Sequence, residues 1–176
     1  VAEGETPATN TATMTAIGMG NALTGDFATA HDVESDQTFS GSVDATATTT
    51  AGIVYGTAIT TASAIGNSAN LINDETMYVS AAQTALDGSS VSSSANLNIS
   101  NYAMTSVTTA TATANAYGSV SYGGENTLDL RQDSGADVSA DSYVLADGGG
   151  LGWSASTVAA ANGNSASIEG YYMYPS

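Results

Sequence analysis

The side chains with the clearest chemical potential are few, and they lie in acidic stretches of the chain. His31 is the single histidine, and Asp32 follows it. A His–Asp pair can orient a serine nucleophile, but no oxyanion motif accompanies this one, which favours a solvated loop. Two carboxylates can hydrolyse a glycosidic bond, although carbohydrate sites also favour Arg, Lys and Trp, which are nearly missing here. We therefore predict that the chain is not an enzyme. The paired carboxylates are Glu34/Asp36, Asp74/Glu75, Asp133/Asp137 and Asp137/Asp141.

The acidic side chains could instead bind a cation. The weak calcium candidates are Asp74, Glu75, Asp129 and Asp133, because carboxylate oxygens are the ligands that Ca²⁺ prefers. No EF-hand spacing connects them, and solvated acidic turns are the favoured interpretation. We predict no cofactor and no metal, and leave calcium as the open alternative.

Charge excludes two classes of partner. The sequence holds 17 acidic residues against one basic residue, Arg131, and its net charge is −16. Nucleic acid and anionic membrane surfaces would both be repelled, because affinity for them depends on Lys and Arg. No apolar run is long enough to span a membrane. We therefore expect no nucleic acid partner and no membrane insertion.

Composition is typical of an exported surface protein. Ala, Thr, Ser and Gly make up more than half of the 176 residues, and the chain has no Cys. Without Cys there can be no disulfide framework and no thiolate metal site. The sequence begins at a Val, which we interpret as the start of a mature protein after removal of a signal peptide. The expected location is extracellular or at the cell surface.

Glycine, glutamine and asparagine recur at long, nearly constant spacings. Gly41, Gly88 and Gly135 are separated by 47 residues each time. Gly-Asn pairs interleave with them, and Gly118-Ser119 fills a gap in that second series. These spacings predict one domain over residues 1–176, with repeats at 21–66, 67–118 and 119–163 and a half-repeat at each end. The combined series steps by about 24 residues, a length that suits one rung of a β-solenoid. The predicted structural turns are Gly20, Asn21, Gly66, Asn67, Gly163 and Asn164.

The segments between these turns are typical of strands. In residues 43–65 the odd-numbered positions carry most of the bulk, including Val43, Ile53 and Tyr55, and we expect them to face inward. Thr favours strands, and no amphipathic helix with caps is visible. We predict an all-β, repeat-built β-solenoid-like or stacked-sheet architecture. A β-sandwich with strand exchange is the alternative, because alternation and turns look alike in both.

Two local motifs resemble known families. The stretch GMGNA at residues 18–22 is similar to the GxGNxA turn of curlin repeats, the units of bacterial curli fibres. The ladder-forming glutamines of curlin repeats do not match, because Gln37, Gln83 and Gln132 occupy a different frame. The Ala-Thr tracts with Gly-Asn-Ser turns also look like the holdfast-anchoring surface proteins of stalked bacteria. Both resemblances imply secretion, self-assembly into a fibre, and a role in adhesion or biofilm.

These observations predict a structural subunit of a self-assembling extracellular filament. Half-repeats at both ends would let each copy complete its neighbour's sheet, so the expected partner is a homo-polymer, with surface polysaccharide as a second possibility. An ice-binding protein with Thr-x-Thr ranks, and a secreted carbohydrate-binding or carbohydrate-active β-solenoid, remain the alternatives. The predicted subunit interface consists of Thr11, Thr13, Thr15, Ile17, Ile168, Tyr171, Tyr172 and Tyr174.

Overall fold

The computed structural model describes residues 1–29, 31–123, 126–147 and 151–170, and these residues form strands and turns without any helix. The prediction of an all-β fold is confirmed. One sheet contains six strands and the other contains three. The six are β1 (Ala2–Thr9), β2 (Ala12–Phe27), β4 (Ser42–Asn73), β6 (Ser90–Ser121), β8 (Asp137–Ala146) and β9 (Leu151–Gly170). The three are β3 (His31–Phe39), β5 (Met77–Ala85) and β7 (Asn126–Ser134).

Every pair of neighbouring strands is parallel, so the chain winds repeatedly in one sense. Ser42 pairs with Ser90, and Ser90 pairs with Asp137. One complete layer therefore takes about 48 residues, and the expected 24-residue rung is wrong by a factor of two. The two interleaved glycine series instead belong to different corners of the same layer. Parallel stacking of this kind is the solenoid-like alternative, because sandwiches are built from antiparallel sheets.

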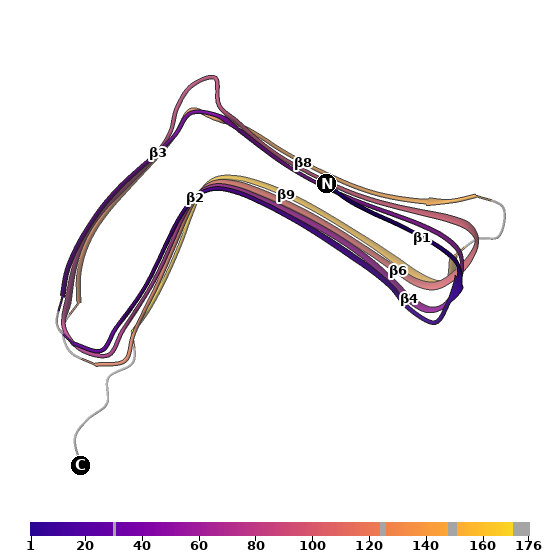
Figure 1. The fold of residues 1–176 in the computed structure, drawn as a ribbon, viewed down its shortest axis with the longest axis horizontal. Helices are drawn as coiled ribbons and strands as arrows, with labels where there is room; N and C mark the ends of the chain where they lie inside the picture. The colour runs from indigo at the N-terminus through magenta and orange to yellow at the C-terminus, as the bar shows by residue number, and fades with distance from the viewer. Residues whose placement is uncertain (30, 124–125, 148–150, 171–176) are drawn as a thin grey trace, which may run out of the picture.

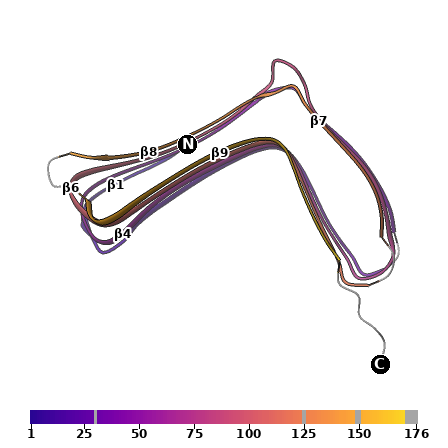
Figure 2. The ribbon, with the colours of Figure 1, turned by 180° about the vertical axis from the view of Figure 1, so that it is seen from behind.

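Each layer has an elbow-shaped outline with two arms (Figure 1). The arm that contains β1 and β8 is here called the first arm. In it, β1 and β8 lie on the convex outside of the elbow, and β2 and β9 lie on its concave inside. β3 forms the convex side of the second arm, and the view from behind shows β7 on that same side (Figure 2). β4 and β6 each run along both sides of the first arm, turn at its tip, and continue past the bend into the second arm.

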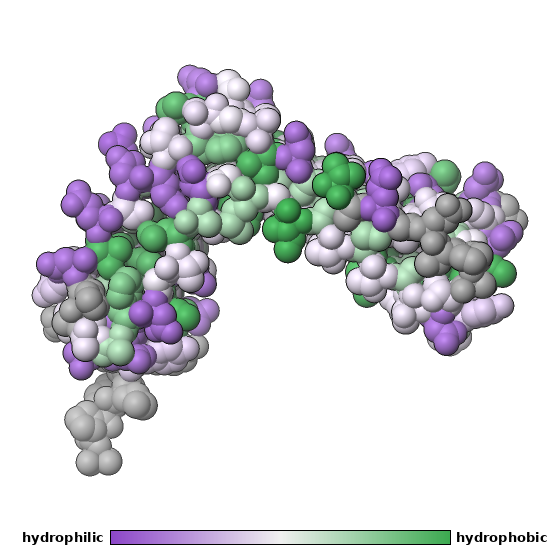
Figure 3. Space-filling model, in the orientation of Figure 1, coloured by the Kyte–Doolittle hydropathy of each residue, from purple (hydrophilic) through white to green (hydrophobic). Residues whose placement is uncertain are grey.

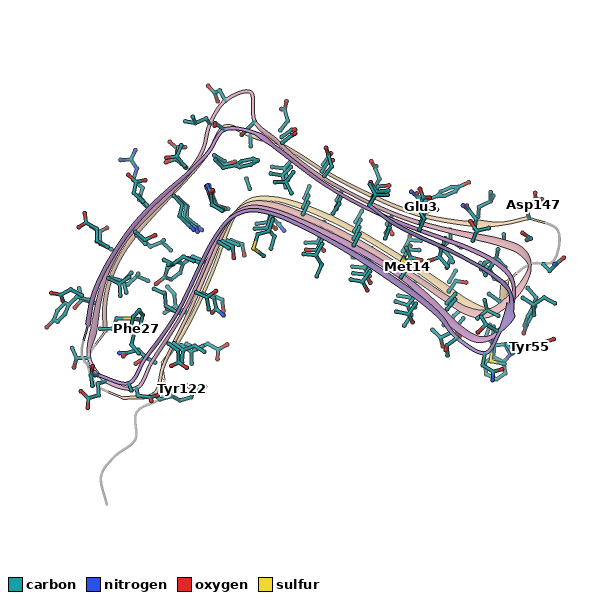
Figure 4. All side chains as sticks on the ribbon, in the orientation of Figure 1. Glu3, Met14, Phe27, Tyr55, Tyr122 and Asp147 are labelled. Atoms are coloured by element: carbon teal, nitrogen blue, oxygen red, sulfur yellow. The ribbon has the colours of Figure 1, made fainter. Side chains whose placement is uncertain are left out.

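The interior of this winding holds three clusters of small and aliphatic residues. The first lies around Ala62, Val91 and Phe39, and the second around Val54 and Leu97 near the tip of the first arm. The third, in the second arm, is built around Leu71, Met77, Val79 and Tyr117. Figure 4 shows Met14 and Phe27 directed between the two sides of their arms. Alanine is the most frequent buried residue in the first two clusters.

The predicted inward-facing set in residues 43–65 is correct only in its first half. Val43 and Ala51 are buried, but Tyr55 is 58% exposed and points outward at the arm tip (Figure 4). Beyond the tip, Ala58 and Ala62 are buried instead. The register of β4 against β6 is irregular between residues 51 and 57, which shifts the alternation by one position. A corner inside a continuous strand therefore reversed the pattern that strict alternation predicts.

No helix within the described residues is long and apolar enough to cross a membrane.

Candidate functional site

Four asparagines form a ladder through the layers at the bend. Parallel pairing sets Asn21 beside Asn67, Asn67 beside Asn115, and Asn115 beside Asn164. The Nδ2 atom of each donates to the Oδ1 atom of the next, and all three donor–acceptor distances are 2.8 Å. Asn67 and Asn115 are fully buried. A parallel sheet places identical residues directly above one another, which allows one amide per layer to make a continuous chain of hydrogen bonds.

The ladder also joins the two sides of the winding. The second Nδ2 hydrogen of Asn21 is donated to the Thr38 carbonyl oxygen at 2.8 Å, and that of Asn67 to the Thr84 carbonyl oxygen at 3.0 Å. Asn115 donates in the same way to the Asp133 carbonyl oxygen at 2.7 Å. Both hydrogens of each interior amide are therefore used, which satisfies polar groups that would otherwise be buried without partners.

Three glutamines form a second ladder opposite the first. Gln83 Nε2 donates to Gln37 Oε1 at 2.7 Å, and Gln132 Nε2 donates to Gln83 Oε1 at 2.8 Å. Each glutamine also donates across the winding, to the carbonyl oxygens of Ser68, Ala116 and Ser165 in turn. Gln37, Gln83 and Gln132 therefore stack on one another in successive layers. They occupy a different position in each layer from the Gly-Asn pairs.

The two ladders have opposite polarity. Asparagine amides donate toward layers later in the chain, as from Asn21 to Asn67. Glutamine amides donate toward earlier layers, as from Gln83 to Gln37. Each described end of the stack therefore presents one amide donor and one amide acceptor.

In the first two layers, glycine at the bend is required because successive layers approach closely there. A Cβ on Gly20 would lie 2.5 Å from the Gly66 carbonyl oxygen, and a Cβ on Gly66 would lie 2.7 Å from the Ala114 carbonyl oxygen. Both would also press on the ring of Phe39, at 3.0 Å. Among the described residues, Gly88 alone has a positive φ, so the Gly-Asn pairs predicted as turns do not adopt a positive-φ turn conformation. These pairs lie inside continuous strands that bend.

The third Gly-Asn equivalent is Ala114-Asn115, which the sequence does not reveal as a glycine motif. Gly118, assigned to this series from its spacing, is in register with Asn70 and lies four residues too late. Asn115 does not follow from the glycine spacing, because Ala114 stands before it in place of glycine. Following asparagine at steps of 46 to 49 residues would have found it.

The predicted interface residues lie on different surfaces. Thr13, Thr15 and Ile17 point out of β2 on the concave side, where Ile17 is 70% exposed. Ile168 is in register with buried Ser119, so it lies on the core side of β9, yet it is 60% exposed. Thr11 lies between β1 and β2. Tyr171, Tyr172 and Tyr174 lie outside the described residues.

The calcium candidates are not assembled into one site. Asp74 and Glu75 lie in the corner before β5, whereas Asp129 is in register with Ser80 and Asp133 with Thr84 along the convex side. Among the residues described, no cluster of three or more His, Cys, Asp or Glu could hold a metal ion. His31 belongs to β3, where its backbone pairs with Met77.

Charge is strongly segregated between the two sides of the elbow. Hydrophilic side chains project along its convex outline, and Glu3 and Asp147 point outward there (Figures 3 and 4). In contrast, residues 6–25, 45–73, 88–124 and 148–168 contain no Asp, Glu, Lys, Arg or His. The strands that line the concave side come almost entirely from these stretches. Four uncharged stretches of sequence thus stack into one uncharged surface.

The outward side chains of the concave side of the first arm form a regular grid, here called the concave face. Its columns run through successive layers of the stack, and Ile17, Met19 and Val158 are its most exposed apolar members. The columns are Thr13–Ile59–Val107–Ser156, Thr15–Thr61–Thr109–Val158, Ile17–Ser63–Thr111–Ala160 and Met19–Ile65–Thr113–Asn162.

Among the described residues, Tyr117 is a buried ionisable group with a shifted pKa. Burial raises the pKa of its phenol above the ordinary value of 10.0. The neighbouring Ser119 side chain lowers the same pKa, but by less than burial raises it. A buried phenol in this position stays neutral and contributes through packing against Leu71 and Met77 in the third cluster.

Comparison with protein families assigns the chain a cellular role. The family model of holdfast attachment protein D (HfaD) matches residues 6–176, which is nearly the whole chain. Searches of curated proteins and of solved structures gave no significant match. The family match confirms the resemblance to holdfast-anchoring surface proteins, and it indicates adhesion or surface anchoring at the cell surface or outside the cell. The chain belongs to the holdfast attachment protein D family.

Proposed function

We propose that this chain is a non-catalytic structural element of a surface anchor, and that its copies join end to end into an extracellular filament. The observation that carries this proposal is the complementarity of the two described ends of the stack. Each end presents unpaired strand edges and one terminal amide from each ladder.

Unpaired edges supply the main-chain part of the contact. β9 pairs with β6 along one edge, and no described strand lies along its other edge. At the opposite end, β2 pairs only with β4 among the described strands. A parallel edge of this kind is a template for a further strand of the same direction. A second copy stacked in the same orientation would add β2 to β9.

Terminal amides would set the register of that contact. Asn164 uses one Nδ2 hydrogen on the Gln132 carbonyl oxygen, and its other hydrogen has no described partner. At the other end, Asn21 Oδ1 accepts no described hydrogen bond. Stacking would join these two atoms. A copy placed upside down would oppose donor to donor and acceptor to acceptor, which disfavours that arrangement.

Apolar burial would add to the hydrogen bonds. Ile168 lies on the core side of β9 and is 60% exposed because no described layer covers it. In the first layer, Leu23 and Phe27 are only partly buried against the third cluster. Stacking would cover both groups at once.

The test compares two single-charge variants of β9. Asn164→Asp keeps the acceptor for Asn115 but replaces the terminal donor with a carboxylate. Ser167→Asp adds the same charge on the outward side of the same strand. We expect the parent chain and Ser167→Asp to form filaments in negative-stain micrographs, and Asn164→Asp to remain short. Equal filament length in all three proteins would contradict the proposal.

A further inference from the structure

The concave face is an uncharged surface on a strongly acidic molecule. None of its outward side chains is ionisable, whereas the net charge of the chain is −16. Its side chains are Thr, Ser, Ala, Asn and aliphatic residues, and Ile17 is 70% exposed. Exposed apolar side chains gathered on one face, here Ile17, Met19 and Val158, are typical of an interaction surface.

Electrostatic repulsion limits which surfaces of two copies can come into contact. Along the convex side, acidic residues such as Asp32, Glu34 and Asp141 project outward, so two convex sides repel each other. The first arm's concave face is free of charge in all four layers. Two copies can therefore meet there without bringing like charges together.

The size and shape of the concave face suit pairing with a second copy. Four layers about 4.8 Å apart and eight residues with a rise of about 3.3 Å give a face of roughly 500 Å². Two such faces bury roughly 1,000 Å², which reaches the lower bound for a specific interface. Small side chains at regular spacing can interdigitate as a dry contact between sheets.

We propose that the concave face pairs two copies of this chain side by side, with Thr15, Thr61, Thr109 and Val158 at the centre of the contact. A two-fold axis parallel to the winding axis brings the same residues of both copies together. The first arm of each copy then lies inside the open elbow of the other (Figure 1). This pairing does not require end-to-end assembly, because it uses side chains that leave the layers sideways.

A matched pair of substitutions on β4 tests the proposal. Thr61 points outward on the concave face, and Thr48 points outward on the convex side of the same strand. Both are partly exposed threonines of the second layer. We expect Thr61→Asp to weaken dimerisation at least about tenfold in sedimentation equilibrium, because it places two carboxylates in one contact. Thr48→Asp carries the same charge change and should dimerise like the parent.

Filament formation is kept separate by carrying both substitutions on the Asn164→Asp background, where end-to-end growth is blocked. Dimerisation that persists on this background supports lateral pairing. It should also strengthen between 0.01 and 1 M salt, because the Debye length shortens to about 3 Å and repulsion between the acidic copies weakens. Single cysteines give an independent readout, since the chain contains none. Thr61→Cys should form a disulfide-linked dimer on oxidation, and Thr48→Cys should not.

Three outcomes overturn the proposal. The first is a parent chain that stays monomeric at high concentration and high salt. The second is equal dimerisation of Thr61→Asp and Thr48→Asp. The third is a neutral glycan that binds the monomer and loses its affinity in Thr61→Asp, since that would assign the concave face to carbohydrate.

Discussion

Replacing Asn67 by Ala tests whether the asparagine ladder stabilises the fold. The Asn67 side chain accepts from Asn21 Nδ2 and donates to the Thr84 carbonyl oxygen and to Asn115 Oδ1. Alanine leaves the last two acceptors without their donors in a region that is fully buried. Each unsatisfied buried group costs about 1–3 kcal/mol, so the free energy of unfolding should fall by about 2–6 kcal/mol.

The assay is urea unfolding followed by far-UV circular dichroism. With a slope of about 2 kcal/mol per molar urea, the midpoint of Asn67→Ala should fall by about 1–3 M. Asn164→Ala is the matched control, because Asn164 is exposed in the last described layer and water can replace its hydrogen bonds. Its cost should stay below about 1 kcal/mol. If the two variants lose the same stability within about 0.5 kcal/mol, the ladder does not stabilise the fold in the way described here.

Three further predictions concern backbone approach, packing and ionisation. Gly66→Ala should lower the free energy of unfolding by about 2 kcal/mol or more in urea titrations, whereas Gly41→Ala, whose Cβ would meet its nearest atom at 3.9 Å, should change it by less than about 0.5 kcal/mol. Leu97→Ala should cost about 2–5 kcal/mol because Leu97 is fully buried, and Leu145→Ala, at 42% exposure, should cost less than half as much by the same measurement. Because the pKa of Tyr117 is raised in the folded state, the folded chain holds its proton more tightly, and stability should fall as pH rises above about 10. Tyr117→Phe should be neutral or stabilising, and its thermal melts should lose that part of the alkaline decline. A decline of equal size in both proteins would contradict the assignment.

The sequence was informative about fold class because strand formation is local. Alternating Thr and Ala in residues 107–118 favours an extended chain, and the 47-residue steps of Gly41, Gly88 and Gly135 carry the stacking distance directly. The 47-residue spacing did not distinguish one layer of about 48 residues from two layers of about 24 residues. That choice depends on which strands pair, as Ser42 does with Ser90, and pairing is a long-range property.

The ladders were only partly predictable. The recurrence of Gln37, Gln83 and Gln132 is visible in the sequence. Their stacking depends on the parallel register of the strands, which the amino-acid sequence alone does not show. Asn115 was missed because the residue before it is Ala114 and not glycine. The concave face was missed for a different reason. Its uncharged stretches are visible in the sequence, but only the winding brings them together on one side.

The account depends most directly on copies stacking along the winding axis. X-ray fibre diffraction from aligned filaments measures this arrangement. The account predicts a meridional reflection near 4.8 Å from strands perpendicular to the filament axis, with a subunit rise of about 19 Å from four layers per copy. Filaments with strands along the axis, or a subunit rise unrelated to the layer spacing, would contradict it.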